Sequence, residues 1–292
     1  MKGDTNHFVF RCDVCGRARA PNPKHKAELG LFRVGAPMEQ LGIDIFGGGT
    51  FQKTRTGFKY ILSIIDHFTK WPVAVPIKDQ TTEVVAQAVL NHWVSTFGVP
   101  MRIHSDRGLM FESEVLHSLC RLLRIHKTQT TPYRPQSDGT TESFNRTLKN
   151  MLAKTANHHP AEWNLYLPSV MMAYNSSGHS YTGFSPYYLV YGRSMRLPLE
   201  LTVDCPRNAI QTHNNAVDLV ARLEYANPLA RAQMHLLQDR AKDRYDAGAV
   251  EKEGKVGDFV RVFQPEPKRG VPFKFHLLCS DRGRLLGFRV WF

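Results

Sequence analysis

Three acidic residues stand where carboxylates are costly unless they have a task. Asp44 lies inside the apolar run LGIDIF, Asp106 ends the run RIHSD, and Glu142 falls in the first turn of the helical segment TTESFNRTLKNMLAKTANH. Taken singly, each has a structural explanation as a hydrogen-bonded strand residue, a turn residue or a charge at a helix start. Taken together, they predict a site for Mg²⁺ or Mn²⁺, because both ions prefer hard oxygen ligands. Two such ions about 4 Å apart can activate an attacking oxygen and stabilise a leaving one during phosphodiester chemistry.

Hydrophobic periodicity predicts the elements that must position these carboxylates. The order is three strands, then helix, strand, helix, strand, helix; the strands are expected at 38–46, 60–68, 71–77, 101–106 and 126–131, and the helices at 81–98, 111–125 and 140–158. A further helix is expected from Ala161 to Ser177, and helical periodicity over 208–246 is interrupted at Pro228. This order predicts an α/β fold with a mixed sheet flanked by helices, whose strand ends and helix starts meet at one edge.

The spacing around Glu142 carries a family resemblance. Thirty-five residues separate Asp106 from Glu142, within the text YRPQSDGTTESFNRTLK. This resembles the D,D-35-E integrases of retroviruses and long-terminal-repeat retrotransposons, and the matching residues are Tyr133, Pro135, Gln136, Gly139, Glu142, Asn145 and Arg146. The later stretch WNLYLPSVMMAYNSSGHSYTGFSPYYLVYGRSMRLPLEL is similar to the segment that follows the core in elements of the Ty3/gypsy type. The likeness covers about residues 36–276.

The resemblance implies an RNase H-like fold and a protein cut from a Pol polyprotein. It implies an endonuclease and transferase that processes DNA 3′ ends, after which each 3′-hydroxyl attacks a target phosphodiester. Asp44, Asp106 and Glu142 would be the catalytic residues and the ligands of two Mg²⁺ or Mn²⁺ ions. Some positions depart from the family pattern, namely Gly48, Leu109, Met110 and Ser143, but none of them removes a ligand.

Basic residues beside Glu142 are candidate DNA contacts. Arg146 and Lys149 lie four and seven residues after Glu142, so a helix projects all three from one face. A solvated charged face is the ordinary explanation for such residues. Here the cations would offset carboxylates that repel phosphate. The resemblance implies that these two residues, with Tyr133 and Gln136, bind nucleic acid.

Three other features have weaker interpretations. Cys12 and Cys15 form the C-x₂-C half of a zinc module, but only His7 precedes them, so we expect weak zinc binding at best. The loop GGGTFQKT imitates a phosphate loop without its second glycine, so no nucleotide cofactor is expected. Asp66 would be a fourth ligand in a nuclease of RNase H type, whereas an integrase gives it a structural role, which we favour.

The amino-acid composition indicates which binding partners and which cellular compartment to expect. The formal net charge of +12 and the pI near 9.6 favour a polyanion, here the element ends and the target duplex. No apolar run is long enough for a membrane span, and no signal peptide is recognisable, so we expect an intracellular protein that is nuclear at least transiently. By resemblance it would work as a homo-oligomer.

Four regions are expected along the chain. They are a truncated zinc-module remnant with a linker at 1–35, the catalytic core with a following helical segment at 36–200, a helical linker at 201–250, and a partial SH3-like β module with an aberrant end at 251–292. Two rival functions stay open: a catalytically inactive DNA-binding relic of a retroelement, and a general RNase H-like nuclease. Nicking of an element-end duplex with Mn²⁺ would separate the first, and activity on an RNA·DNA hybrid would support the second.

Overall fold

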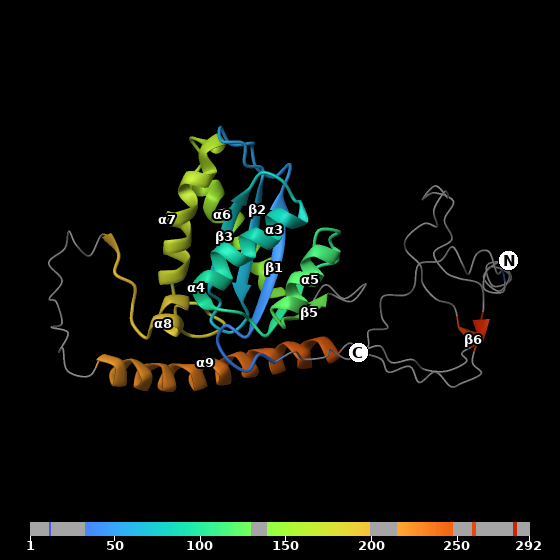
Figure 1. The fold of residues 1–292 in the computed structure, drawn as a ribbon. Helices are drawn as coiled ribbons and strands as arrows, with labels where there is room; N and C mark the ends of the chain where they lie inside the picture. Colours follow the sequence, from blue (N-terminus) through green and yellow to red (C-terminus); the bar gives the residue numbers. More distant parts are fainter. Residues whose placement is uncertain are drawn as a thin grey trace, which may run out of the picture. The chain divides into compact units, whose positions relative to one another are not determined.

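A five-stranded mixed sheet carries the candidate site (Figure 1). The computed structural model describes residues 12, 33–129, 139–198, 215–247, 259–260 and 283–284. The sheet order is β3-β2-β1-β4-β5, and the strands are β1 (Gln40–Gly47), β2 (Tyr60–Asp66), β3 (Pro72–Ile77), β4 (Arg102–Ser105) and β5 (His126–Gln129). The first three strands pair antiparallel, whereas β4 and β5 run parallel to β1. The sequence predicted this order of strands and helices.

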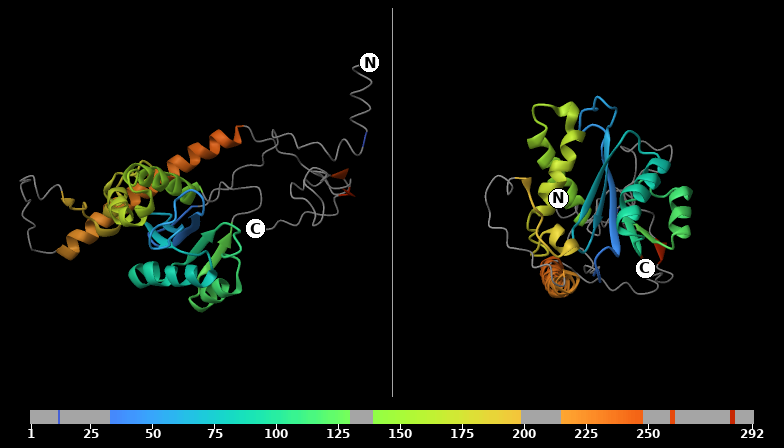
Figure 2. Two further views of the ribbon diagram at one scale, coloured as in Figure 1. Left: turned by 90° about the horizontal axis from the view of Figure 1, so that it is seen from above. Right: turned by 60° about the vertical axis from the view of Figure 1, so that its left-hand side comes forward.

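Helices cover both faces of the sheet, which is why β2 is buried along nearly its whole length (Figure 2). One face packs against α3 (Thr82–Val89), a π-helical turn (Leu90–Val94), α4 (Ser95–Phe97) and α5 (Glu114–Leu122). The other face packs against α6 (Gly139–Thr155) and α7 (Trp163–Ser176), with a 3₁₀ turn (Pro160–Glu162) between them. Each face therefore has its own apolar core.

The central strand β1 divides its side chains between these two cores. Leu41 and Ile43 belong to the core under α3 and α5, whereas Phe46 belongs to the core under α6 and α7. Successive side chains of a strand alternate between faces, so Gly42 and Asp44 face the same side as Phe46. This alternation turns Asp44 toward α6, the helix that carries Glu142.

The segment after α7 contains α8 (Pro186–Tyr191) and the long helix α9 (Asn215–Asp246). Contrary to the sequence prediction, Pro228 lies inside α9 and does not interrupt it. Ala226 and Ala230, on either side of this proline, are buried against Leu189 of α8, while Pro228 itself is exposed. Burial of small side chains on one face thus offsets the backbone hydrogen bond that proline cannot make.

The chain divides into two compact units, one at Phe32–Gln238 and the other formed by Met1–Leu31 and Asp239–Phe292. In the second unit, the short strands β6 (Phe259–Val260) and β7 (Gly283–Arg284) pair antiparallel. The predicted zinc-module remnant, apart from Cys12, and the predicted SH3-like module, apart from these two strands, lie outside the described residues. Among the helices that the structure describes, none is long and apolar enough to cross a bilayer.

Candidate functional site

The parallel pairing of β1 with β4 brings Asp44 and Asp106 together. The register places Ile43 opposite Ser105; Asp44 is the next residue of β1, and Asp106 directly follows the end of β4. The charge of Asp106 is close enough to contribute to a raised pKa at Asp44. Asp106 Oδ1 accepts a hydrogen bond from the Gly108 amide at 2.9 Å, which fixes the carboxylate at the start of the turn after β4.

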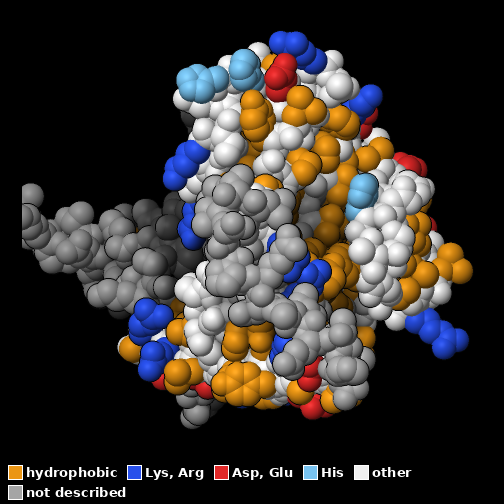
Figure 3. Space-filling model, turned by 90° about the vertical axis from the view of Figure 1, so that its left-hand side faces the viewer, with side chains coloured by type: hydrophobic (Ala, Val, Ile, Leu, Met, Phe, Trp, Pro, Cys, Tyr) orange, Lys and Arg blue, Asp and Glu red, His pale blue; other side chains and the backbone are white. Residues whose placement is uncertain are grey.

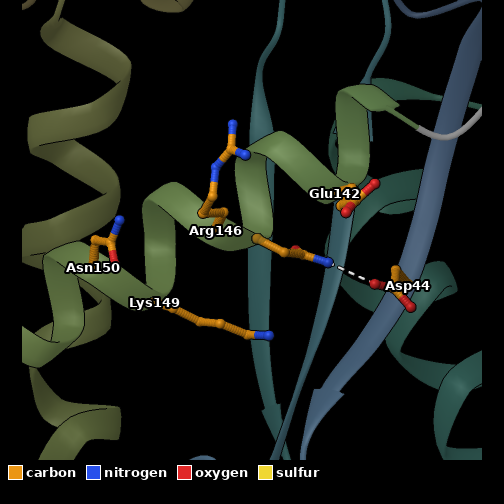
Figure 4. Close-up of a pocket in the computed structure, with 6 residues that line it drawn as sticks. Asp44, Glu142, Arg146, Lys149 and Asn150 are labelled. Carbon is orange, nitrogen blue, oxygen red and sulfur yellow. Dashed lines mark hydrogen bonds between the residues drawn. The ribbon is translucent and has the colours of Figure 1, made fainter. Parts of the chain in front are cut away.

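Glu142 reaches the same region because the first turn of α6 sits directly on β1. A Cβ atom at Gly42 would lie 2.2 Å from Thr141 Oγ1 and 2.6 Å from His67 Nε2, so only glycine leaves room for this approach. Glu142 follows Thr141 and is exposed above Asp44. A pocket of about 260 Å³ results, and it is lined by Asp44, Glu142, Asn145, Arg146, Lys149 and Asn150 (Figure 4).

Asp44 is the most constrained of the three carboxylates. Its Oδ1 accepts from the Ile45 amide at 2.7 Å, and its Oδ2 accepts from Asn145 Nδ2 at 2.6 Å. The pKa of Asp44 is raised to about 6, chiefly by burial and also by the charge of Asp106, while the hydrogen bonds and Lys149 oppose the shift. Burial, the largest cause of the shift, disfavours the ionised form of this carboxylate, and positive charge nearby would favour it.

A divalent cation would supply that charge. Asp44 and Asp106 offer hard oxygen atoms on adjacent strands, and Glu142 offers another in the same pocket, so the donor set fits Mg²⁺ or Mn²⁺. In the part of the chain that the structure describes, no three His, Cys, Asp or Glu side chains are already gathered as a metal cluster. The three carboxylates are thus neighbours that have not converged on one point.

Arg146 and Lys149 line the pocket from α6 together with Glu142, and their predicted contact with DNA stays a prediction. Lys149 Nζ lies 5.0 Å from the centroid of the Phe46 ring, and Lys149 lowers the pKa of Asp44. In Figure 4, Lys149 extends from α6 toward the strands, whereas Arg146 does not extend toward Asp44. On the face shown in Figure 3, Lys and Arg side chains are spread among acidic and apolar ones, so overall charge alone does not locate a DNA path there.

Other predicted residues have different outcomes. Tyr133, Gln136 and Cys15 lie outside the described residues, so their predicted roles stay predictions. The sequence motif marks Asn145 only as a matching residue, and the structure makes it a direct partner of Asp44. Its position three residues after Glu142, on the same helix face, was the signal available in the sequence.

Asp66 is buried at the end of β2 and does not line the pocket. Its Oδ2 accepts from the Thr69 amide at 2.8 Å and from the Thr69 hydroxyl at 2.6 Å. Burial raises the pKa of Asp66, and the bonds from Thr69 oppose this shift. These contacts agree with a structural role in the turn between β2 and β3.

Comparisons with known proteins converge on one family. Residues 35–135 match the family described as the integrase core domain. The chain is 31% identical over 229 residues to the Gag-Pol polyprotein of avian reticuloendotheliosis virus, covering 78% of this chain and 19% of that protein. It is 26% identical over 231 residues to the retrovirus-related Pol polyprotein from transposon 412 of Drosophila melanogaster, covering 78% of this chain and 18% of the relative. The chain thus spans about a fifth of the length of these relatives.

Among solved structures, the fold is similar to that of a chain in the simian T-cell lymphotropic virus intasome in complex with the PP2A regulatory subunit B56 gamma. The TM-score is 0.51 with 22% identity, over 68% of this chain and 69% of that chain. The mixed sheet with flanking helices is therefore the RNase H-like fold of an integrase catalytic core, as the sequence predicted.

Proposed function

The chain belongs with the retroelement integrases, whose core domain it carries, and we propose that it is a metal-dependent polynucleotidyl transferase acting on DNA. The proposed reactions are 3′-end processing of the element DNA, which is an endonuclease step, and strand transfer into a target duplex. One observation carries the proposal: the β1–β4 register sets Asp44 beside Asp106, next to a pocket that Glu142 and two basic residues also line. An RNase H-like nuclease would need a fourth carboxylate, and the buried Asp66 does not supply one at this pocket.

Each residue has a part in the proposed mechanism. Asp44, Asp106 and Glu142 would hold the divalent ions, either Mg²⁺ or Mn²⁺. Such ions, when bound, activate the attacking oxygen and stabilise the leaving oxygen of a phosphodiester. Asn145 orients Asp44 through its hydrogen bond. Arg146 and Lys149 bind the phosphates of the DNA that reaches the pocket.

The proposal extends to assembly and location. Joining two element ends to one target requires two such sites, so we expect a homo-oligomer that holds both ends. The target is chromosomal DNA, which places the protein in the nucleus at least transiently. Light scattering with and without element-end duplex tests the first expectation, and fluorescence microscopy of a tagged chain in dividing cells tests the second.

Activity is tested with a labelled duplex copied from the end of the source element and a plasmid as target, both incubated with Mn²⁺. We expect a 3′-end cut followed by joining. Asp106→Asn should abolish both reactions while the affinity for duplex is retained, because a ligand charge is lost and the basic residues remain. A wild-type chain that binds the duplex without cutting it would identify an inactive relic. A variant that cuts as fast as wild type would refute the metal-site assignment.

A further inference from the structure

A buried lysine lies beneath the helix that carries Glu142. Lys70 belongs to the turn between β2 and β3, and the residue is only 4% exposed. Its backbone φ is 61°, a left-handed conformation that residues with a Cβ seldom adopt. Both burial of an ammonium group and this backbone conformation are unfavourable, so the side chain has contacts that offset them.

Those contacts join three segments of the chain. Lys70 Nζ donates to the carbonyl oxygen of His67 at 2.8 Å within its own turn. It also donates to Thr140 Oγ1 at 3.2 Å, in the first turn of α6. The ring of Tyr181, from the segment after α7, lies 4.7 Å from Nζ. Burial lowers the pKa of Lys70 to about 8, and Asp66 opposes that shift, so the group remains a cation at neutral pH.

The Lys70 ammonium group lies at the start of α6, which is not where helix electrostatics favour a cation. The start of a helix is its positive end, so a lysine there gains nothing from the helix dipole. Attraction to the charge of Asp66 alone would not need a side chain that extends to Thr140. The contact with Thr140 therefore indicates a role at the start of α6, two residues before Glu142.

The opposite side of the same turn is also fixed. Thr141 is fully buried over Gly42, beside His67 from the turn that contains Lys70. Thr140 is thus held by Lys70, while Thr141 rests on β1. Glu142 directly follows these two residues in the first turn of α6.

We propose that Lys70 is a positioning residue for Glu142, which fixes the first turn of α6 through Thr140 so that Glu142 can join Asp44 and Asp106 around a divalent ion. The inference rests on the proposed function of the three carboxylates. It assigns Lys70 no contact with DNA or metal. Its effect should therefore appear in metal affinity and turnover, and not in the affinity for duplex.

The test compares Lys70→Met and Thr140→Val with Thr147→Val in the full chain. Thr147 is a matched control because its hydroxyl donates only to the carbonyl of Ser143 within α6, at 3.0 Å, among its described contacts. Free Mn²⁺ is measured by electron paramagnetic resonance, well below the unfolding temperature of each variant. Loss of a residue that orients a ligand typically weakens metal binding by about tenfold or more, so we expect that loss for Lys70→Met and Thr140→Val. Thr147→Val should match wild type.

Two further measurements separate positioning from loss of folding. The KM for labelled duplex should stay at the wild-type value while kcat falls. The double variant should bind Mn²⁺ no more weakly than Lys70→Met alone, because both changes remove one interaction. If Lys70→Met does not fold, the half-buried Thr140→Val carries the test. The Lys70 inference would be overturned if Thr140→Val bound Mn²⁺ as tightly as wild type, or if the losses of Mn²⁺ affinity added up in the double variant. Neither result would affect the proposed function. A wild-type chain that binds no Mn²⁺ would overturn the proposed function together with the Lys70 inference.

Discussion

Asn145 donates a hydrogen bond to Asp44, with 2.6 Å between Nδ2 and Oδ2. The two residues lie 101 positions apart, and the bond ties the middle of β1 to the helix that carries Glu142. Its geometry leaves the remaining lone pairs of Asp44 available to a metal ion. Asn145 therefore orients a proposed metal ligand.

We expect Asn145→Ala to lower Mn²⁺-dependent nicking by about 10- to 100-fold, the usual effect of removing a residue that orients a metal ligand. Duplex affinity should be unchanged, because Arg146 and Lys149 remain. Asn150→Ala is the matched control, since Asn150 lines the same pocket from the next turn of α6. Equal losses of nicking activity in Asn145→Ala and Asn150→Ala would show that the hydrogen bond from Asn145 to Asp44 is not what the reaction requires.

Gly42 determines how closely α6 approaches β1. A Cβ atom at this position would overlap Thr141 Oγ1 and His67 Nε2. We expect Gly42→Ala to push the start of α6 away from the strand, at a stability cost of about 1–3 kcal/mol and with loss of nicking. Thermal unfolding and the nicking assay measure the two effects.

Two variants serve as controls for this change. Gly178→Ala adds the same methyl group where nothing lies within 4 Å, and it should leave both measurements unchanged. Thr141→Ala added to Gly42→Ala removes the closest overlapping atom and should restore part of the activity. If Gly42→Ala nicks DNA at the wild-type rate, the close approach is not needed for the chemistry.

The sequence predicted much of the site because its signals are local. Each of the three carboxylates can be recognised from its own neighbours: one lies inside an apolar strand, one at a strand end and one at a helix start. The placement of Arg146 and Lys149 on the face of Glu142 follows from helical periodicity alone. The order of strands and helices then implied that the three carboxylates would meet at one edge. The β1–β4 register agrees with that expectation for Asp44 and Asp106.

Contacts between distant segments could not be predicted in the same way. Gly42 reads as an ordinary glycine in a strand until Thr141 is seen above it. Lys70, which follows the strand residues in the segment HFTK, resembles an exposed turn residue, yet it is buried. Pro228 was expected to interrupt a helix, because the sequence does not show that Ala226 and Ala230 are buried against Leu189. In each case a tertiary contact outweighs the local preference.

Protonation of His67 should make the fold sensitive to acid. The pKa of His67 is lowered to about 3, chiefly by burial and also by the charges of Lys70 and His104. Between about pH 6.5 and pH 3, the unfolded chain therefore binds a proton on this residue that the folded chain does not. Stability falls as the pH is lowered through this window, by about 1.4 kcal/mol per pH unit from this group.

Urea unfolding of wild type and His67→Gln at pH 7 and pH 5 measures this contribution. The wild-type chain should lose more stability between the two pH values than the variant, by about 2 kcal/mol. Comparing the two losses removes the contribution of groups that both chains share, His104 included. Equal losses in the two chains would show that His67 titrates in the folded protein much as it does in the unfolded one.

The basic face of α6 is expected to hold DNA beside the carboxylates. Arg146 and Lys149 line the pocket with Asp44 and Glu142, and each cation that neutralises a phosphate releases a counterion. Duplex affinity should therefore fall with salt, and replacing both residues by alanine should flatten the plot of log affinity against log salt by about 2 units.

Lys154 provides the control for this prediction, because it lies on α6 five residues after Lys149, is exposed, and does not line the pocket. Binding is measured without divalent ions, so that loss of a metal ligand cannot contribute to the result. If any cation on α6 can bind DNA phosphate, Lys154→Ala should flatten the slope of log affinity against log salt as much as Lys149→Ala does. If the pocket locates the DNA, Lys154→Ala should leave the slope unchanged while Arg146→Ala and Lys149→Ala each remove about one unit. An unchanged slope in the double variant would mean that DNA approaches the three carboxylates along another surface.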